Sequence, residues 1–319
     1  MATFPDALAS ALADRYRIEK QLGQGGMATV WLAHDITNDR AVALKVLNPE
    51  LSRTVGADRF RREIRVAGSF DHPNILTVFD SGEVDEHIWF TMPLVRGETV
   101  ADLLARREPV PLERALAITR GVGAALAVAH ERGVVHRDIK PDNILLEDDR
   151  VLVADFGVAR AVSEMNDKLT ATGMVVGTVT YMSTEQAAGE KEIDGRSDQY
   201  SLACVLYEMV SGELPFKGPT PTAAMMRRFA GPPKRLRPFT DIPEVVENAM
   251  FRALEREPAA RYATVTEFID ALDGKAATPP PTPAPAPPQE TAKPAGAKSG
   301  CLGVLVGWIV LGTLVRHLA

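Results

Sequence analysis

The sequence has few cysteines and no excess of positive charge, and each absence excludes a class of protein. Two cysteines occur in 319 residues, Cys204 and Cys301, which excludes a disulfide framework or a cysteine-rich zinc site and fits a reducing compartment. Lysine and arginine total 36 against 42 aspartates and glutamates, for a net charge of −6. Because a general nucleic-acid binder needs clustered Lys and Arg, we expect no nucleic-acid partner.

The N-terminus lacks the features of a secretory signal. Residues 1–10 contain neither a basic region nor an apolar run, so we expect the main body of the protein to be cytoplasmic. The composition is otherwise that of a globular protein, with 45% hydrophobic and 24% charged residues.

Composition changes sharply near residue 275. Residues 16–272 mix apolar and charged residues, as a folded domain does. Residues 275–299 contain eight prolines and no aromatic residue, which predicts a disordered Pro/Ala-rich linker. Fully extended, this linker reaches roughly 75 Å.

Residues 301–315 are fifteen consecutive uncharged, mostly apolar residues, flanked by Lys298 and Arg316. A membrane span needs about 20 residues, with ~17 as the lower end, so this run is long enough only if its flanking cations reach the head groups. We expect residues 300–319 to be a C-terminal transmembrane anchor that tethers the protein to the cell membrane by a single span. An interfacial or oligomerising helix is the alternative.

A glycine-rich segment lies between two apolar stretches near the N-terminus. Gly23, Gly25 and Gly26 precede Val30, and glycines allow backbone N–H groups to approach phosphate oxygens closely. Because β-branched and aromatic residues follow, we expect a loop between two strands that covers a nucleotide, instead of the strand-to-helix turn of a Rossmann fold. Alone, the pattern is also compatible with an ordinary glycine hairpin.

A lysine and a glutamate downstream form a candidate ion pair. Residues 42–45 form an apolar strand that ends in Lys45, and residues 58–70 are expected to form a helix with Glu63 on its apolar side. A carboxylate there requires a cationic partner across a cleft, which Lys45 can supply. The pair would then hold the lysine ammonium against nucleotide phosphates.

The most informative string is residues 136–143, His-Arg-Asp-Ile-Lys-Pro-Asp-Asn. It follows an expected helix over residues 112–132, and we expect apolar strands at 133–135 and 144–146 on either side of it. Asp138 can accept a hydroxyl proton, Lys140 can neutralise phosphate, and Asn143 can bind Mg²⁺. Asp155, in an Asp-Phe-Gly string at a strand end, suits the same cation.

Together these motifs resemble the protein kinase family, and more narrowly the eukaryotic-like bacterial Ser/Thr protein kinases. The resemblance covers residues 16–272. It implies an α+β, bilobal protein kinase fold, with a mostly β N-lobe at about 16–95 and a helical C-lobe at about 96–272. It also implies ATP and Mg²⁺ as cofactors, protein substrates, and a possible homodimer through the small lobe.

The resemblance assigns roles residue by residue. Asp138 is the catalytic base, and Lys140, Lys45 and Glu63 complete the catalytic set, with Lys45 paired to Glu63. Asn143 and Asp155 hold the metal. The groups that cover or contact ATP are Gly23, Gly25, Gly26, Val30, Ala43, Lys45, Met92 (gatekeeper) and Val95 (backbone contact to adenine). His136 is expected to be a packed core histidine that stabilises the catalytic loop.

Residues 160–180 resemble an activation loop. Thr170 and Thr172 occupy the positions that bacterial relatives autophosphorylate, and a phosphothreonine would give Arg137 an anionic partner. Thr178 marks the substrate segment and, with Lys140, indicates Ser/Thr specificity.

The sequence departs from the family pattern at two positions. Thr184 stands where a proline usually stiffens the chain before Glu185, and Ala28 replaces the third loop glycine. We expect these changes to soften the substrate-binding segment without abolishing catalysis, and we expect Glu185 to form a buried ion pair with Arg261. Two other functions stay open: a pseudokinase-type nucleotide-binding scaffold and a small-molecule phosphotransferase. A pseudokinase commonly lacks one or more of five catalytic side chains, and this sequence has all of them: Lys45, Glu63, Asp138, Asn143 and Asp155. The long loop at residues 160–180 weighs against a small-molecule phosphotransferase.

Overall fold

The N-terminal lobe is an antiparallel sheet in the order β1-β2-β3-β5-β4. The computed structural model describes residues 3–26, 28–55, 64, 68–156, 179–237 and 240–275. The five strands are β1 (Tyr16–Gln24), β2 (Ala28–Asp35), β3 (Arg40–Leu47), β4 (Asp80–Val84) and β5 (His87–Pro93). The segment of residues 23–28 thus joins two paired strands, as the sequence predicts for a loop that covers a nucleotide.

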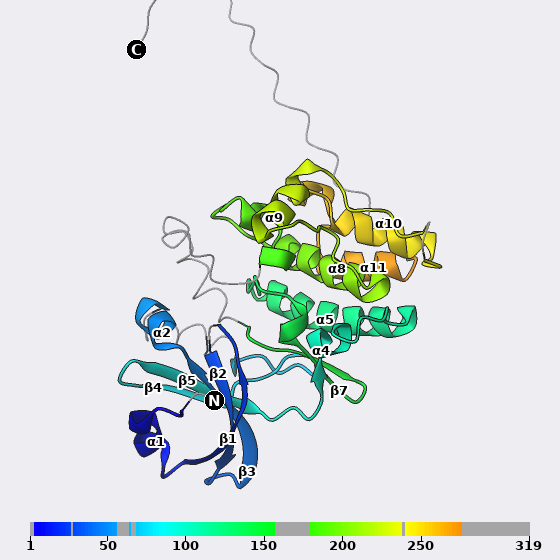
Figure 1. Ribbon diagram of the computed structural model, residues 1–319. Helices are drawn as coiled ribbons and strands as arrows, with labels where there is room; N and C mark the ends of the chain where they lie inside the picture. Colours follow the sequence, from blue (N-terminus) through cyan, green and yellow to red (C-terminus); the bar gives the residue numbers. More distant parts are fainter. Residues whose placement is uncertain are drawn as a thin grey trace, which may run out of the picture. The chain divides into compact units, whose positions relative to one another are not determined.

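A short helix covers one face of this sheet (Figure 1). Helix α1 (Asp6–Leu12) buries Leu8 and Leu12 against a cluster that contains Trp31, Leu44 and Trp89. The Phe4 and Trp31 rings meet edge-to-face with centroids 5.1 Å apart. Helix α2 (Pro49–Val55) follows β3 and packs near β5.

The C-terminal lobe is built around helix α8 (Gly195–Ser211), which is buried along nearly its whole length. Helices α5 (Leu112–Glu131), α10 (Glu244–Ala253) and α11 (Val265–Leu272) pack against it, as Figure 1 shows. Gly212 follows the last residue of α8, and its φ of 70° is the left-handed conformation typical of a helix C-terminus. The other helical segments are α4 (Val100–Leu104), α7 (Thr184–Ala187), α9 (Pro221–Ala230) and the 3-10 turns η1 (Pro141–Asn143), η3 (Val179–Tyr181) and η4 (Pro258–Ala260).

A small three-stranded sheet lies next to the two central motifs of the sequence, residues 136–143 and Asp155. Its order is β6-β7-β8, with β6 (Glu98–Thr99), β7 (Ile144–Glu147) and β8 (Arg150–Val153). The backbone of β8 also bonds to the segment before β4: Val153 N–H donates to the Asn74 carbonyl at 2.8 Å, and Leu76 N–H donates to the Val153 carbonyl at 2.9 Å. These bonds connect the two lobes directly beside Asp155.

The bilobal α+β architecture and the helix over residues 112–132 are confirmed. The strand expected at residues 133–135 is wrong, because Gly133 adopts a φ of 71° as the chain leaves α5 and the segment pairs with no strand among the described residues. Most of the helix expected at residues 58–70, the linker at 275–299 and the tail at 300–319 lie outside the described residues.

Candidate active site

The string of residues 136–143 forms a loop that is held from within. The His136 side chain is fully buried, and its ring lies 4.6 Å from that of Phe156, edge to face. The Asp138 backbone N–H donates to His136 Nδ1 at 3.2 Å, so Nε2 carries the ring proton and donates to the Ala154 carbonyl at 2.8 Å. The expectation that His136 is a structural core residue is confirmed.

A buried carboxylate in α8 supports the same loop. Asp198 accepts hydrogen bonds from the backbone N–H groups of His136 at 2.8 Å and Arg137 at 2.7 Å, and its Oδ2 lies 2.8 Å from His130 Nε2. Burial raises the pKa of Asp198, but the hydrogen bond from His130 and its charge outweigh burial, so the pKa lies below its ordinary value. The sequence interpretation missed this role. The available signal was an aspartate in the first turn of a helix whose later turns are mostly apolar.

Asp138, Lys140 and Asn143 converge at the end of the loop. Lys140 Nζ donates to Asp138 Oδ2 at 2.6 Å. The Asn143 amide donates to the same oxygen at 3.1 Å and to the Asp138 carbonyl at 2.8 Å. Asp138 is therefore oriented by two donors, while 30% of its side chain stays accessible to an incoming group.

Lys45 and Asp155 meet across the lobes although 110 residues separate them. Lys45 Nζ lies 2.5 Å from Asp155 Oδ2, and the side chains are 15% and 17% exposed. The other carboxylate oxygen, Oδ1, is buried and has no hydrogen-bond partner among the described residues. Burial raises the pKa of Asp155, but the Lys45 ammonium more than offsets it, and the pKa is lowered.

Four of the residues expected at the nucleotide occupy one face of the sheet. Val30 pairs with Lys45 across β2 and β3, and Ala43 pairs with Met92 across β3 and β5. Since Ala43 and Lys45 are two positions apart on one strand, all four side chains project from the same face.

Met92 and Val95 pack against a buried cluster of Leu76, Leu152 and Ala154. Leu145 joins the same cluster, and the sequence interpretation did not single it out. Val95 also lines a cavity of about 390 Å³, which contains none of the polar groups of the catalytic loop.

The space beside the glycine-rich backbone, where side chains would lie, is empty at two of its glycines. An added Cβ would meet nothing within 4 Å at Gly23 or Gly26. Gly25 N–H donates to the Ala28 carbonyl at 2.9 Å, and the Asn48 amide donates to the Gly26 carbonyl at 2.6 Å. Space for a ligand thus remains along this backbone.

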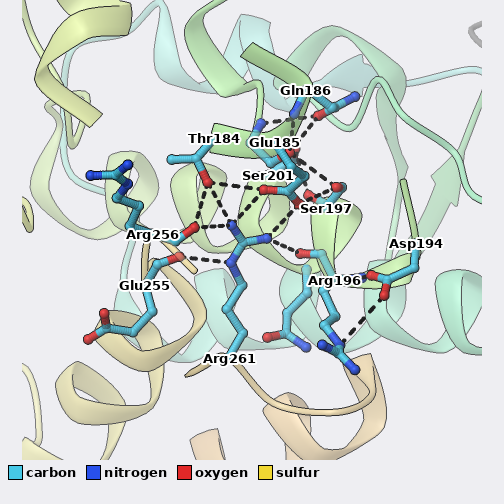
Figure 2. A network of polar contacts seen from close by, with 12 residues as sticks. Thr184, Glu185, Gln186, Asp194, Arg196, Ser197, Ser201, Glu255, Arg256 and Arg261 are labelled. Carbon is cyan, nitrogen blue, oxygen red and sulfur yellow. Dashed lines mark hydrogen bonds and ion pairs between the residues drawn. The ribbon is translucent and has the colours of Figure 1, made fainter. Parts of the chain in front are cut away.

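A second polar network lies beside the catalytic loop and is drawn in Figure 2. Arg261 forms two contacts with the Glu185 carboxylate, at 2.7 and 2.8 Å, and both side chains are buried. Ser197 donates to Glu185 as well. The expected buried ion pair is confirmed.

Thr184 belongs to this network. Its hydroxyl donates to the Arg256 carbonyl at 2.6 Å and accepts from Arg261 Nη2 at 3.0 Å (Figure 2). Gln186, in the same short helix, donates to the Arg137 carbonyl at 2.8 Å and so joins this network to the catalytic loop. The threonine that replaces the usual proline therefore ties its segment down by hydrogen bonds.

Comparison with known proteins agrees with this geometry. Residues 16–270 match the family model described as "Protein kinase domain". The chain belongs to the protein kinase family. Similar curated proteins are the Serine/threonine-protein kinase PknB of Mycolicibacterium smegmatis, 40% identical over 266 residues, and that of Mycobacterium tuberculosis, 38% identical over 268 residues.

Each of these two alignments covers 81% of this chain and 42% of the relative, so the chain spans less than half the length of these kinases. Among solved structures, the crystal structure of Rad53 residues 1–466 in complex with AMP-PNP is similar, with a TM-score of 0.68 and 26% identity. That match covers 82% of this chain and 65% of the other.

The site offers oxygen ligands that fit Mg²⁺. The Ala154 N–H donates to the Asn143 carbonyl at 2.9 Å, which places Asn143 beside the residue that precedes Asp155. Asp155 Oδ1 is buried and has no partner in the described part of the chain, and the Asn143 amide nitrogen donates to Asp138, which leaves the amide oxygen available. One carboxylate and one amide are typical protein ligands of Mg²⁺, which takes its other ligands from phosphates and water. Within the described ranges there is no cluster of three His, Cys, Asp or Glu side chains that could hold a metal.

Several expected site residues lie outside the described residues. They are Glu63, Thr170, Thr172 and Thr178. The predicted Lys45–Glu63 pair therefore stays a prediction, as do the two phosphorylation sites and the role of Thr178. In the part of the chain that the structure covers, no helix has both the length and the apolar character needed to cross a bilayer.

Proposed function

We propose that this chain is a Ser/Thr protein kinase that transfers the γ-phosphoryl group of ATP to Ser and Thr hydroxyls of proteins, with Mg²⁺ as the metal. The observation that carries the proposal is the convergence of Lys45, Asp155, Asn143 and Asp138, which come from both lobes. The similarity to bacterial Ser/Thr kinases supports the same reaction.

Asp138 is proposed as the group that receives the hydroxyl proton. Lys140 and Asn143 hold one of its oxygens, and this fixes the plane of the carboxylate before a substrate arrives. A positioned base of this kind contributes about 10²–10⁴-fold to a reaction rate. Lys140 lies close enough to Asp138 to place a positive charge where negative charge develops during transfer.

The nucleotide is proposed to lie under the glycine-rich segment. Its phosphates would be held by Lys45 and by backbone N–H groups near Gly23, Gly25 and Gly26, and its base would contact Val30, Ala43, Met92 and Val95. When bound, Mg-ATP supplies the phosphoryl group and the cation that neutralises it, and Asp155 and Asn143 are the residues that would hold that cation.

Regulation and location are part of the proposal. Thr170 and Thr172 are the proposed autophosphorylation sites, and Thr178 is the proposed substrate-segment residue. Residues 16–272 would form the catalytic domain in the cytoplasm, residues 275–299 its linker and residues 300–319 its membrane anchor. A homodimer through the small lobe stays a prediction. No observation favours a nucleotide-binding scaffold without catalysis.

The deciding experiment is phosphate transfer from labelled ATP by the full-length protein. The comparison is between the wild type, Asp138→Asn and Lys45→Met. We expect autophosphorylation by the wild type and a loss of roughly 10²–10⁴-fold in Asp138→Asn. Equal labelling of all three proteins would point to a contaminating kinase and defeat the proposal. Mass spectrometry of the wild type should find phosphate on Thr170, Thr172 or both.

The anchor is tested separately. Membrane fractionation of the protein with and without residues 300–319 should move the kinase to the soluble fraction when the tail is removed. An unchanged soluble pool would defeat the anchor and leave the catalytic proposal intact.

A further inference from the structure

Arg228 in α9 is a buried cation that the proposed mechanism does not use. Its side chain is 2% exposed, and its guanidinium carbon lies 6.0 Å from the centre of the Phe216 ring. Nη2 donates to the Thr180 backbone carbonyl. Its Nε and Nη1 atoms are buried, and within the described ranges they make no hydrogen bond and no carboxylate forms an ion pair with the side chain.

Fold stability does not account for this arginine. A buried guanidinium stabilises a protein when its donors are filled and a carboxylate balances its charge. Arg261 meets both conditions, since each of its nitrogens donates to an oxygen and Glu185 pairs with it (Figure 2). Arg228 meets neither, so an apolar side chain of similar length would fill its place at least as well.

The carbonyl that Arg228 holds belongs to the segment beside the catalytic loop. This segment, residues 179–187, is tied to that loop where Gln186 donates to the carbonyl of Arg137, the residue before Asp138. It is tied to α8 where Ser201 Oγ donates to the Tyr181 carbonyl at 2.8 Å. A peptide spans about 3.3 Å per residue, so one that presents a hydroxyl at Asp138 also covers this neighbouring segment with its flanking residues.

Arg228 and Arg261 bond to this segment at Thr180 and at Thr184, and each arginine lies beside one of two stacked aromatic rings. The Tyr200 and Phe216 rings are parallel, with an interplanar angle of 3° and centroids 6.4 Å apart. Arg261 lies 4.8 Å from the Tyr200 ring and bonds Thr184, whereas Arg228 lies near Phe216 and bonds Thr180. Around Thr184 the segment forms side-chain hydrogen bonds with Arg256, Arg261 and Ser197, whereas the Thr180 carbonyl accepts its bond from Arg228.

We propose that Arg228 is a positioning residue for the protein substrate: its bond to the Thr180 carbonyl sets the backbone of residues 179–182 against which the substrate peptide lies. It adds little or nothing to the stability of the fold. This inference rests on the proposed function, because it concerns how a protein acceptor reaches Asp138.

The test compares Arg228→Met with Arg227→Met in the full chain. Arg227 is the exposed neighbour of Arg228 on the same helix, so its variant removes an equal charge and serves as the matched control. The acceptor is a full-length Asp138→Asn copy, labelled in trans from ATP. Three quantities are measured for each enzyme: the KM for this acceptor, the KM for ATP, and the amide hydrogen exchange of residues 179–183.

For Arg228→Met we expect the KM for the acceptor to rise about tenfold, the loss of one hydrogen bond to a charged group, while the KM for ATP changes less than twofold. Exchange at residues 179–183 should accelerate, and the midpoint of thermal unfolding should stay level or rise. Arg228→Lys, which keeps the cation and one possible donor to Thr180, should restore part of the acceptor affinity. Arg227→Met should match the wild type.

Three results would overturn the inference. The first is failure of Arg228→Met to fold, because that would make the arginine structural. The second is an equal rise in both KM values, and the third is unchanged exchange at residues 179–183. If the wild type labels no acceptor at all, the proposed function fails, and the exchange measurement still decides whether Arg228 holds the segment.

Discussion

The Arg261–Glu185 pair in the helical lobe is buried and the Lys45–Asp155 pair between the lobes is mostly buried, but the two pairs differ in how their atoms are hydrogen-bonded. Every nitrogen of Arg261 donates to an oxygen, and both Glu185 oxygens accept. In the other pair, Asp155 Oδ1 is buried without a hydrogen bond in the described part of the chain. A saturated pair holds structure together, whereas a pair with an unused oxygen has capacity to bind a ligand.

The largest expected effect is the loss of the saturated pair. Arg261→Met removes one partner and leaves Glu185 as an uncompensated buried charge, so the free energy of unfolding should fall by about 3–5 kcal/mol. Chemical unfolding curves measure this. Arg256→Met is the control, because the Arg256 side chain is 59% exposed and its pair with Glu257 should contribute at most about 1 kcal/mol. Equal losses in the two variants would contradict the contrast.

The second effect is the pH dependence of the same pair. Burial raises the pKa of Glu185, but hydrogen bonding and the charge of Arg261 dominate and lower it from 4.5 to about 2. A group with a lowered folded-state pKa stabilises the protein fully above its unfolded pKa and loses that contribution as the pH falls. The shift corresponds to about 3 kcal/mol.

We therefore expect Glu185→Gln to be less stable than the wild type by about 3 kcal/mol at pH 7. This gap should narrow as the pH falls below about 4.5, since the wild type loses the contribution that the variant lacks. Unfolding curves of both proteins from pH 7 to pH 3 measure the gap. A gap that stays constant over that range would show that Glu185 is not held ionised by the network.

The smallest effect is that of the hydroxyl at position 184. Thr184→Val keeps the shape of the side chain but removes the hydroxyl that donates to the Arg256 carbonyl, which keeps its hydrogen bond from Arg261 Nη2 at 3.1 Å. This should lower the free energy of unfolding by about 1 kcal/mol. Thr184→Ser retains the hydroxyl and should stay close to the wild type. Thermal unfolding of the two variants side by side makes the comparison. If Val and Ser behave alike, the hydroxyl is not part of the saturated network.

The sequence predicted the catalytic groups well because their motifs are local. Asp138, Lys140 and Asn143 lie within six residues of one another, and the loop that carries them brings them into contact. The two lobes were expected from the resemblance to protein kinases, and the strands at residues 42–45 and 144–146 were expected from apolar runs. The strand expected at residues 133–135 was wrong because an apolar run after a helix also suits a loop that enters a buried site.

The supporting residues were harder to predict because their partners are distant in the chain. Asp198 contacts the catalytic loop across about 60 residues, and Arg228 contacts Thr180 across 48. Thr184 was expected to soften its segment, because the missing proline was weighed and the hydroxyl was not. No local pattern shows that its hydroxyl reaches Arg256.

The most direct test of the contrast is thermal unfolding of Asp155→Asn with and without Mg-ATP, beside Arg261→Met. The account predicts that Mg-ATP raises the unfolding temperature of the wild type by binding its folded state, and that Asp155→Asn loses this rise while its ligand-free stability falls far less than that of Arg261→Met. A variant at Asp155 that unfolds as easily as Arg261→Met, yet still gains the full rise with Mg-ATP, would contradict it.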